Sequence, residues 1–220
     1  MAASLKLLER QPVEPYYFGY NLESYATCGV NLTFNDSGGL ALAQALHLGV
    51  LRYPGGTGSN IWDMKKGRYL PPPTPQAKGY DKWTKWKPVV DSFPEGTFSA
   101  SAFLQGLGGS AAKTIWGLNV YSRNASETCE QVHYISQLPG QQEPGVLLEL
   151  GNELYLTSQG LPRFPDAGSY ALEMQPVVAC ARKLMPRAKV AAAGWIGNGS
   201  EATAAWNRGL RPYASIFDGV

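Results

Sequence analysis

The octapeptide Val146-Leu-Leu-Glu-Leu-Gly-Asn-Glu153 contains the residues best suited to chemistry. Its apolar first half predicts a buried parallel strand, and Gly-Asn-Glu ends that strand. In barrels of alternating strands and helices, active sites lie at the carboxyl edge of the strands. Glu153 at that edge is therefore a candidate general acid and base. The alternative is an ordinary strand-to-helix turn in which Glu153 is a solvated carboxylate.

Short apolar segments alternate with longer amphipathic ones, which predicts βαβ units and a parallel sheet. The predicted strands are Tyr17–Leu22, Gly49–Tyr53, Thr114–Val120, the octapeptide and Lys189–Gly194, with a sixth beginning at Ile216–Val220. The predicted helices are Ser37–Leu48, with Ser37 as its N-cap, Ser99–Gly106, Ser126–Gln137, Asp166–Met185, with Asp166 as its N-cap, and Glu201–Leu210. Pro176 should kink or split the fourth helix. The stretch from Gly58 to Thr97, which is rich in proline, is predicted to be irregular.

These units predict an α/β fold of the (β/α)8 TIM-barrel type, truncated after about five βα units, in residues 16–220. Residues 1–15 would form an N-terminal extension. A closed barrel takes about 250 residues, whereas this chain has 220. An open five-stranded sheet is the alternative. Unpaired strand edges favour aggregation, so we expect a truncated product or an incomplete gene model.

A carboxyl group at this edge suits hydrolysis of a glycosidic bond with retention of configuration. That reaction uses two carboxyl groups about 5–5.5 Å apart, of which one protonates the leaving oxygen and the other attacks the sugar. The acid must hold its proton near neutral pH, which burial favours. Glu153 follows an apolar strand and fits the first role. Asn152 is placed to hydrogen-bond a sugar 2-hydroxyl, a contact that strengthens in the transition state.

Arg52 lies in Val50-Leu-Arg-Tyr-Pro-Gly-Gly-Thr57, at the end of the second predicted strand. A guanidinium beside a nucleophilic carboxylate keeps that carboxylate ionised and oriented. The position therefore indicates a site residue. The alternative is a structural ion pair inside the sheet.

The motifs Leu51-Arg-Tyr-Pro-Gly-Gly-Thr57, Ser59-Asn-Ile-Trp-Asp63, Gly117-Leu-Asn119 and Glu149-Leu-Gly-Asn-Glu153 follow one another in this order. Together they resemble the heparanase-like glycoside hydrolases of family 79, in the clan of retaining (β/α)8 glycosidases. The resemblance covers most of residues 16–220. It implies that Glu153 is the acid/base, that Asn152 binds substrate beside it, and that Arg52 and Asn119 line the site.

The same resemblance places the attacking Glu at the end of strand 7, which this sequence does not reach. Glu173 and Glu201 fall in predicted helices and do not fill that role. The resemblance implies a polysaccharide or glycoconjugate substrate, in particular one that contains glucuronic acid, and no metal or organic cofactor. We therefore expect a glycoside hydrolase whose chain is inactive or incomplete alone. The alternative is a non-catalytic glycan-binding protein.

Three further residues and one segment are candidates for binding sugar. Glu23 follows the first strand, Tyr155 lies two residues beyond Glu153, and Trp195 follows the fifth strand, although each is as well explained by packing or surface exposure. The segment from Trp62 to Trp86 combines aromatic and basic residues, namely Trp62, Tyr69, Tyr80, Trp83, Trp86, Lys65, Lys66, Arg68, Lys78, Lys82, Lys85 and Lys87. It favours an acidic glycan, against the alternative of a solvated loop whose aromatic rings pack on the barrel rim.

Composition excludes several classes of function. The net charge of +2 argues against bulk nucleic-acid binding. No apolar stretch approaches the roughly 18 residues of a membrane span. His47 and His133 fall in predicted helices, which argues against a His-based triad or a His-rich metal site. Gly55-Gly-Thr-Gly58 is not followed by the Gly-Lys-Ser/Thr of a phosphate loop.

Two features of the sequence point to different localisations, so the localisation stays open. The N-terminus lacks the apolar core of a secretory signal. Four Asn-x-Ser/Thr sequons, at Asn31, Asn35, Asn124 and Asn198, are typical of a secreted protein. Cys28, Cys129 and Cys180 lack metal spacing and allow at most one disulfide. Cys180 is predicted to be a small core residue of its helix.

Overall fold

The computed structural model describes residues 19–23, 33–73, 79–110, 113–156, 163–195 and 200–219. Its strands are β1 (Gly19–Glu23), β2 (Val50–Gly55), β3 (Trp62–Asp63), β4 (Arg68–Tyr69), β5 (Lys113–Leu118), β6 (Leu147–Leu150) and β7 (Lys189–Ala192). The helices are α1 (Ser37–Ala45), α2 (Gly79–Asp91), α3 (Ala100–Gln105), α4 (Ala125–Ser136), α5 (Ala167–Leu184) and α6 (Glu201–Leu210). Short 3-10 helices are η2 (Thr57–Ile61), η3 (Leu107–Ser110) and η4 (Arg211–Ile216).

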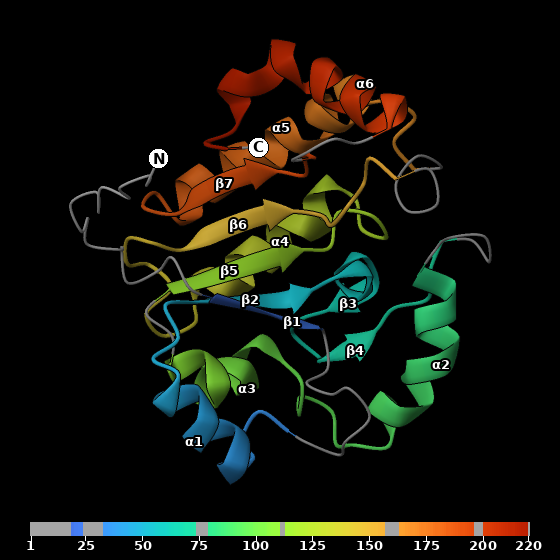
Figure 1. Ribbon diagram of the computed structural model, residues 1–220. Helices are drawn as coiled ribbons and strands as arrows, with labels where there is room; N and C mark the ends of the chain where they lie inside the picture. Colours follow the sequence, from blue (N-terminus) through green and yellow to red (C-terminus); the bar gives the residue numbers. More distant parts are fainter. Residues whose placement is uncertain are drawn as a thin grey trace, which may run out of the picture.

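Five parallel strands form the main sheet in the order β1-β2-β5-β6-β7 (Figure 1). The order in the sheet is the order in the chain, so every crossover advances in the same direction. A doubly wound sheet would instead reverse direction at a switch point. The progression, with a helix between successive strands, is that of a (β/α)8-type barrel over five βα units. The predicted fold class is therefore confirmed.

The two faces of the sheet differ in burial. One face is buried under the helices and carries Leu51, Tyr53, Trp116, Leu118, Leu148, Leu150, Val190 and Ala192. The other face corresponds to the barrel interior and is half-buried, with Val50, Arg52, Ile115, Leu147, Glu149 and Ala191. Because side chains alternate along a strand, this register places Arg52 and Glu149 on the same interior face.

A sixth strand begins where the sequence predicts it. Gly219 forms a parallel bridge with Ala191 of β7. The ladder continues on both sides, since the Asp218 amide donates to the Val190 carbonyl at 2.7 Å and the Ala192 amide donates to the Gly219 carbonyl at 2.9 Å. The progression of parallel strands therefore continues past β7.

The prediction of an irregular stretch from Gly58 to Thr97 is wrong over much of its length. It contains η2, the β3–β4 hairpin and α2, which lie on the side toward which the sheet strands point (Figure 1). Charged residues and Pro88 obscured the helical pattern of α2, but Pro88 is exposed and the helix runs through it. Pro176 likewise lies on the exposed side of α5 and does not split that helix, because a proline there removes one hydrogen bond without disturbing the packed face.

Helix boundaries follow their capping residues. The Asp166 and Ser99 side chains accept from the amides of Ser169 and Ala102, as N-caps of α5 and α3. Ser37, however, is the first residue of α1 rather than its N-cap. Asp36 caps this helix instead, accepting from the Gly39 amide at 2.9 Å. The helix also ends before its predicted end at Leu48, because His47 adopts a left-handed conformation.

A disulfide joins Cys129 on α4 to Cys180 on α5. Cys180 is half-buried rather than a core residue, so that prediction is wrong, although the limit of one disulfide holds. In the chain, α4 precedes β6 and α5 follows it. The loop that the disulfide closes therefore contains β6 and the Gly-Asn-Glu turn. Cys28 lies outside the described residues, as do the sequon positions Asn31 and Asn198. Asn35 and Asn124 are exposed.

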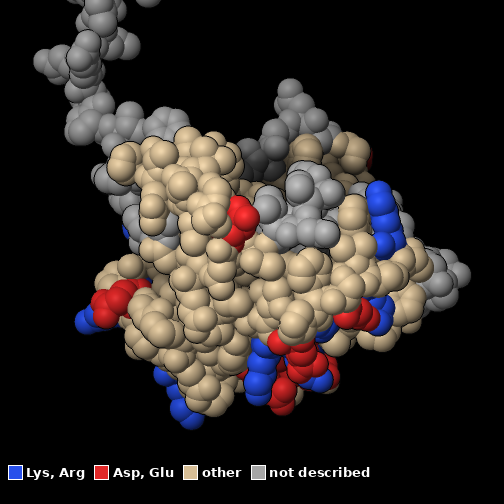
Figure 2. Space-filling view, turned by 90° about the horizontal axis from the view of Figure 1, so that it is seen from below, with Lys and Arg blue, Asp and Glu red and all other residues tan. Residues whose placement is uncertain are grey.

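Several residues of the aromatic and basic segment have structural partners, and a role of the segment in binding sugar stays a prediction. Trp62 and Tyr69 are buried in the core and pack edge to face. Asp91 forms ion pairs with Arg68 and Lys87. Lys78 and the side chains of Tyr80 and Lys82 lie outside the described part of the chain. On the face in Figure 2, positive and negative side chains lie close to one another near the lower rim, rather than in separate patches.

Candidate functional site

The turn after β6 presents Glu153 at the carboxyl edge of the sheet. Gly151 has φ 85° and Glu153 has φ 49°. A Cβ at Gly151 would lie 2.6 Å from Leu154 Cδ1 and 2.9 Å from Val120 Cγ2, so glycine is required there. A left-handed Glu is uncommon, and such backbone strain concentrates at functional sites. Glu153 is half-buried at this turn.

Asn60 fixes the backbone of this turn. The Asn60 side chain, from η2, accepts from the Asn152 amide at 3.0 Å and donates to the Asn152 carbonyl at 2.8 Å. Asn60 itself is 3% exposed, so this paired contact is shielded from water. The motif that follows β2 therefore holds the motif that follows β6, although 92 residues separate them. Sequence reasoning quoted Asn60 within a motif but gave it no role.

Arg52 reaches across the interior face from β2 and contacts three side chains. Its guanidinium forms an ion pair with Glu149 and donates to Asn21 Oδ1 at 2.8 Å and to Asn152 Oδ1 at 3.0 Å. Asn152 Nδ2 lies 3.4 Å from Glu153 Oε2. The structure thus brings together three sequence-predicted site residues, Arg52, Asn152 and Glu153.

Glu149 was missed as a site residue. The signal was present, because Glu149 is the one charged residue in the apolar run Val146–Leu150. A charge inside a buried parallel strand needs a partner. Of the two interpretations of Arg52, a guanidinium beside a nucleophile or an ion pair inside the sheet, the contact with Glu149 matches the second.

Asn119 is fully buried beyond the end of β5 and does not face open space. Its Nδ2 donates to the Trp62 carbonyl at 3.2 Å and to Ser122 Oγ at 2.8 Å, and its Oδ1 accepts from the Ser122 amide at 3.1 Å. These contacts order the turn that follows β5. A role in lining the site stays a prediction.

Tyr155 and Trp195 lie together at the carboxyl edge, with ring centroids 5.4 Å apart in an edge-to-face arrangement. Burial raises the pKa of the Tyr155 phenol, and the negative charge of Glu153 adds to this shift, whereas Arg52 opposes it. The side chain of Asn207, on α6, holds the backbone of Trp195 at both its N–H and its C=O. Glu23 ends β1 opposite Gly55, and its side chain lies outside the described part.

Tyr170 ties the carboxyl ends of β6 and β7 together. Its hydroxyl donates to the Leu150 carbonyl at 2.8 Å and accepts from the Ala193 amide at 3.1 Å, and burial raises its pKa.

Tyr170→Phe should lower the free energy of unfolding by about 1–3 kcal/mol, because two buried backbone groups lose their partner. Urea denaturation checks this value. Tyr213→Phe, at a half-buried tyrosine, is the control and should change stability little; an equal loss in both variants would contradict the assignment.

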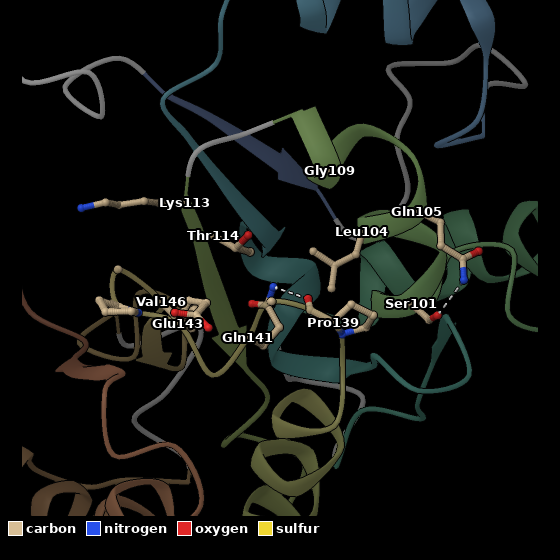
Figure 3. A pocket seen from close by; sticks show the side chains of 13 residues that line it. Ser101, Leu104, Gln105, Gly109, Lys113, Thr114, Pro139, Gln141, Glu143 and Val146 are labelled. Carbon is tan, nitrogen blue, oxygen red and sulfur yellow. Dashed lines mark hydrogen bonds between the residues drawn. The ribbon is translucent and has the colours of Figure 1, made fainter.

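Two hollows lie near the sheet. One, of about 550 Å³, lies at the amino end of β5 between α3 and the loop that precedes β6, with Leu104, Thr114 and Gln141 in its wall (Figure 3). The other, of about 530 Å³, lies between α5 and α6, and Tyr155 forms part of its wall. No cluster of His, Cys, Asp or Glu suited to a metal ion occurs in the described part of the chain. None of the helices described here is long and apolar enough to cross a membrane.

No family model matches the sequence, and no curated protein matches it. Among solved structures, the chain is similar to a family 51 α-L-arabinofuranosidase from Bifidobacterium longum, with a TM-score of 0.64 and 17% identity. The likeness covers 94% of this chain and 43% of that one, so this chain spans less than half the length of its neighbour. At this identity the likeness shows the fold alone. The chain therefore has a mixed α/β fold of the (β/α)8 type.

Proposed function

We propose that this chain supplies the acid/base residue of a retaining O-glycosyl hydrolase that acts on a polysaccharide or glycoconjugate. The observation that carries the proposal is the position of Glu153. It lies in a left-handed turn at the carboxyl edge of the sheet, with Asn152 against its carboxylate. In (β/α)8 enzymes this edge is the catalytic face. The arabinofuranosidase whose fold is similar to that of this chain is a glycosidase.

In this mechanism, Glu153 protonates the leaving oxygen and then removes a proton from the attacking water. Asn152 binds a sugar hydroxyl beside it. The attacking carboxylate must stand about 5–5.5 Å from the acid. Glu149 is already paired with Arg52 on the interior face, below the edge. The resemblance to the heparanase-like hydrolases assigns the attacking Glu to strand 7 of a barrel, beyond the five strands of the described sheet.

A preference for glucuronic-acid-containing glycans is the finer part of the proposal. It rests on the ordered motifs around Arg52, Asn119 and Glu153. Two of the basic residues of this region, Arg68 and Lys87, pair with Asp91. The test substrates should therefore include both neutral and uronate glycosides.

The experiment is to supply glycosides to a protein that includes strand 7 and its attacking Glu, and to follow the first product by ¹H NMR. Retention predicts that the released sugar first appears with the anomeric configuration of the substrate, and that Glu153→Ala abolishes its release from unactivated substrates. An inverted first product would exclude the retaining mechanism. Binding of the glycoside without hydrolysis would support a glycan-binding protein instead.

A further inference from the structure

Glu149 occupies a defined place on the interior face of the sheet. It lies level with Gly117 on β5 and Ala191 on β7. The Arg52 side chain crosses β5 from β2 to reach Glu149 on β6. A Cβ at position 117 would lie 2.4 Å from the Pro54 carbonyl oxygen, so this position must remain glycine. The side chains of Arg52 and Glu149 are only 17% and 28% exposed, which shields the ion pair from solvent.

The contact between Arg52 and Asn152 decides which way the Asn152 amide faces. A guanidinium only donates hydrogen bonds, so the Asn152 atom that faces it must be Oδ1, at 3.0 Å. The Nδ2 group then faces the opposite way, toward Glu153 Oε2 at 3.4 Å. One Nδ2 hydrogen remains for a ligand.

Asn60 already holds the Asn152 backbone at both its N–H and its C=O. The contact with Arg52 therefore orients the Asn152 side chain. Arg52 in turn is held by Glu149 on one side and by Asn21 on the other. A chain of contacts therefore runs from Glu149 through Arg52 and Asn152 to Glu153.

We propose that Glu149 is a positioning residue: by holding Arg52, it fixes the Asn152 amide with its N–H donor beside Glu153. This inference rests on the proposed function of Glu153 as acid/base. The Asn152 N–H then lies next to the scissile bond and donates a hydrogen bond to an oxygen of the bound sugar. Glu149 itself lies one layer below the edge and is neutralised by Arg52, so it positions rather than attacks.

The test is ¹⁵N NMR of the Asn152 side-chain amide in this chain, with the signal assigned by its loss in Asn152→Asp. Glu149→Leu should increase exchange of the Asn152 NH₂ protons with solvent about five- to tenfold, as expected for loss of a hydrogen-bond anchor. Glu149→Gln keeps an acceptor for Arg52 and should restore most of the protection. Glu173→Gln is the matched control, since it breaks the Arg163–Glu173 ion pair elsewhere and should leave Asn152 unchanged.

Unchanged exchange in a folded Glu149→Leu variant would overturn the positioning role. If that variant fails to fold, Arg52→Lys decides: lysine keeps the charge but lacks the planar fork that serves Glu149 and Asn152 together. Exchange should then rise, and protection equal to that of the parent chain would overturn the proposal. Failure of the proposed function is a distinguishable result. If Glu153 takes no part in catalysis, the effect of Glu149→Leu on exchange of the Asn152 NH₂ protons is still expected.

Discussion

In a protein that includes strand 7 and its attacking Glu, Glu153→Gln should slow hydrolysis of glycosides with poor leaving groups by about 10²- to 10⁴-fold, the usual contribution of general acid catalysis. Gln cannot donate a carboxyl proton to the leaving oxygen. An activated aryl glycoside has a leaving group that needs no proton, so its glycosylation step should change little. Deglycosylation still needs a base and should become slow. Stopped-flow measurement with the activated substrate should therefore show a burst of phenolate followed by slow turnover.

The matched control is Glu173→Gln, which makes the same chemical change on α5, in the ion pair with Arg163. It should leave the rates for both substrates within about twofold, as is usual for a surface change away from a site. The acid/base assignment is wrong if Glu153→Gln slows glycosylation of the activated substrate as much as deglycosylation. It is equally wrong if neither rate changes.

Loss of the Cys129–Cys180 disulfide should lower the free energy of unfolding by about 4 kcal/mol. The two cysteines are 51 residues apart in the sequence. Cross-linking them restricts the unfolded chain, and this entropic effect grows with the size of the closed loop. The loop contains β6 and the turn with Asn152 and Glu153. Guanidinium denaturation of the oxidised chain and of Cys129→Ser/Cys180→Ser measures the difference.

Reduction provides an internal control for this prediction. Dithiothreitol should destabilise the parent chain by about the same amount and leave the double serine variant unaffected. Equal denaturation midpoints for the oxidised and reduced parent chain would show that the cross-link adds no stability. A disulfide also indicates an oxidising environment, in agreement with the exposed sequon residues Asn35 and Asn124.

The fold was largely predictable because its signals are local. Apolar strands such as Leu147–Leu150 and N-caps such as Asp166 depend on residues that are close in sequence. Where these local signals alternate, the handedness of βαβ units leaves few possible topologies. Predictions were wrong where local signals competed: Asp36 rather than Ser37 caps α1, and proline lies on the exposed sides of α2 and α5 without splitting either helix.

The location of the candidate site was also readable from sequence, because a Glu that follows a parallel strand must lie at the carboxyl edge of the sheet. The partners of the site residues were not. Arg52 and Glu149 are 97 residues apart, and Asn60 and Asn152 are 92 apart. Asn119 matched a motif, yet its side chain turns into the core and bonds to the Trp62 carbonyl.

By itself, the sequence determined that this protein is an α/β chain of βαβ units with a carboxylate at the end of its fourth main strand. Tertiary structure alone decided that Arg52 pairs with Glu149 and orients Asn152, that Trp62 and Tyr69 are core residues, and that Cys129 bonds to Cys180. The physical reason is register. Periodicity and caps depend on neighbouring residues, whereas a contact between strands depends on their alignment, and a shift of one residue turns a side chain to the opposite face.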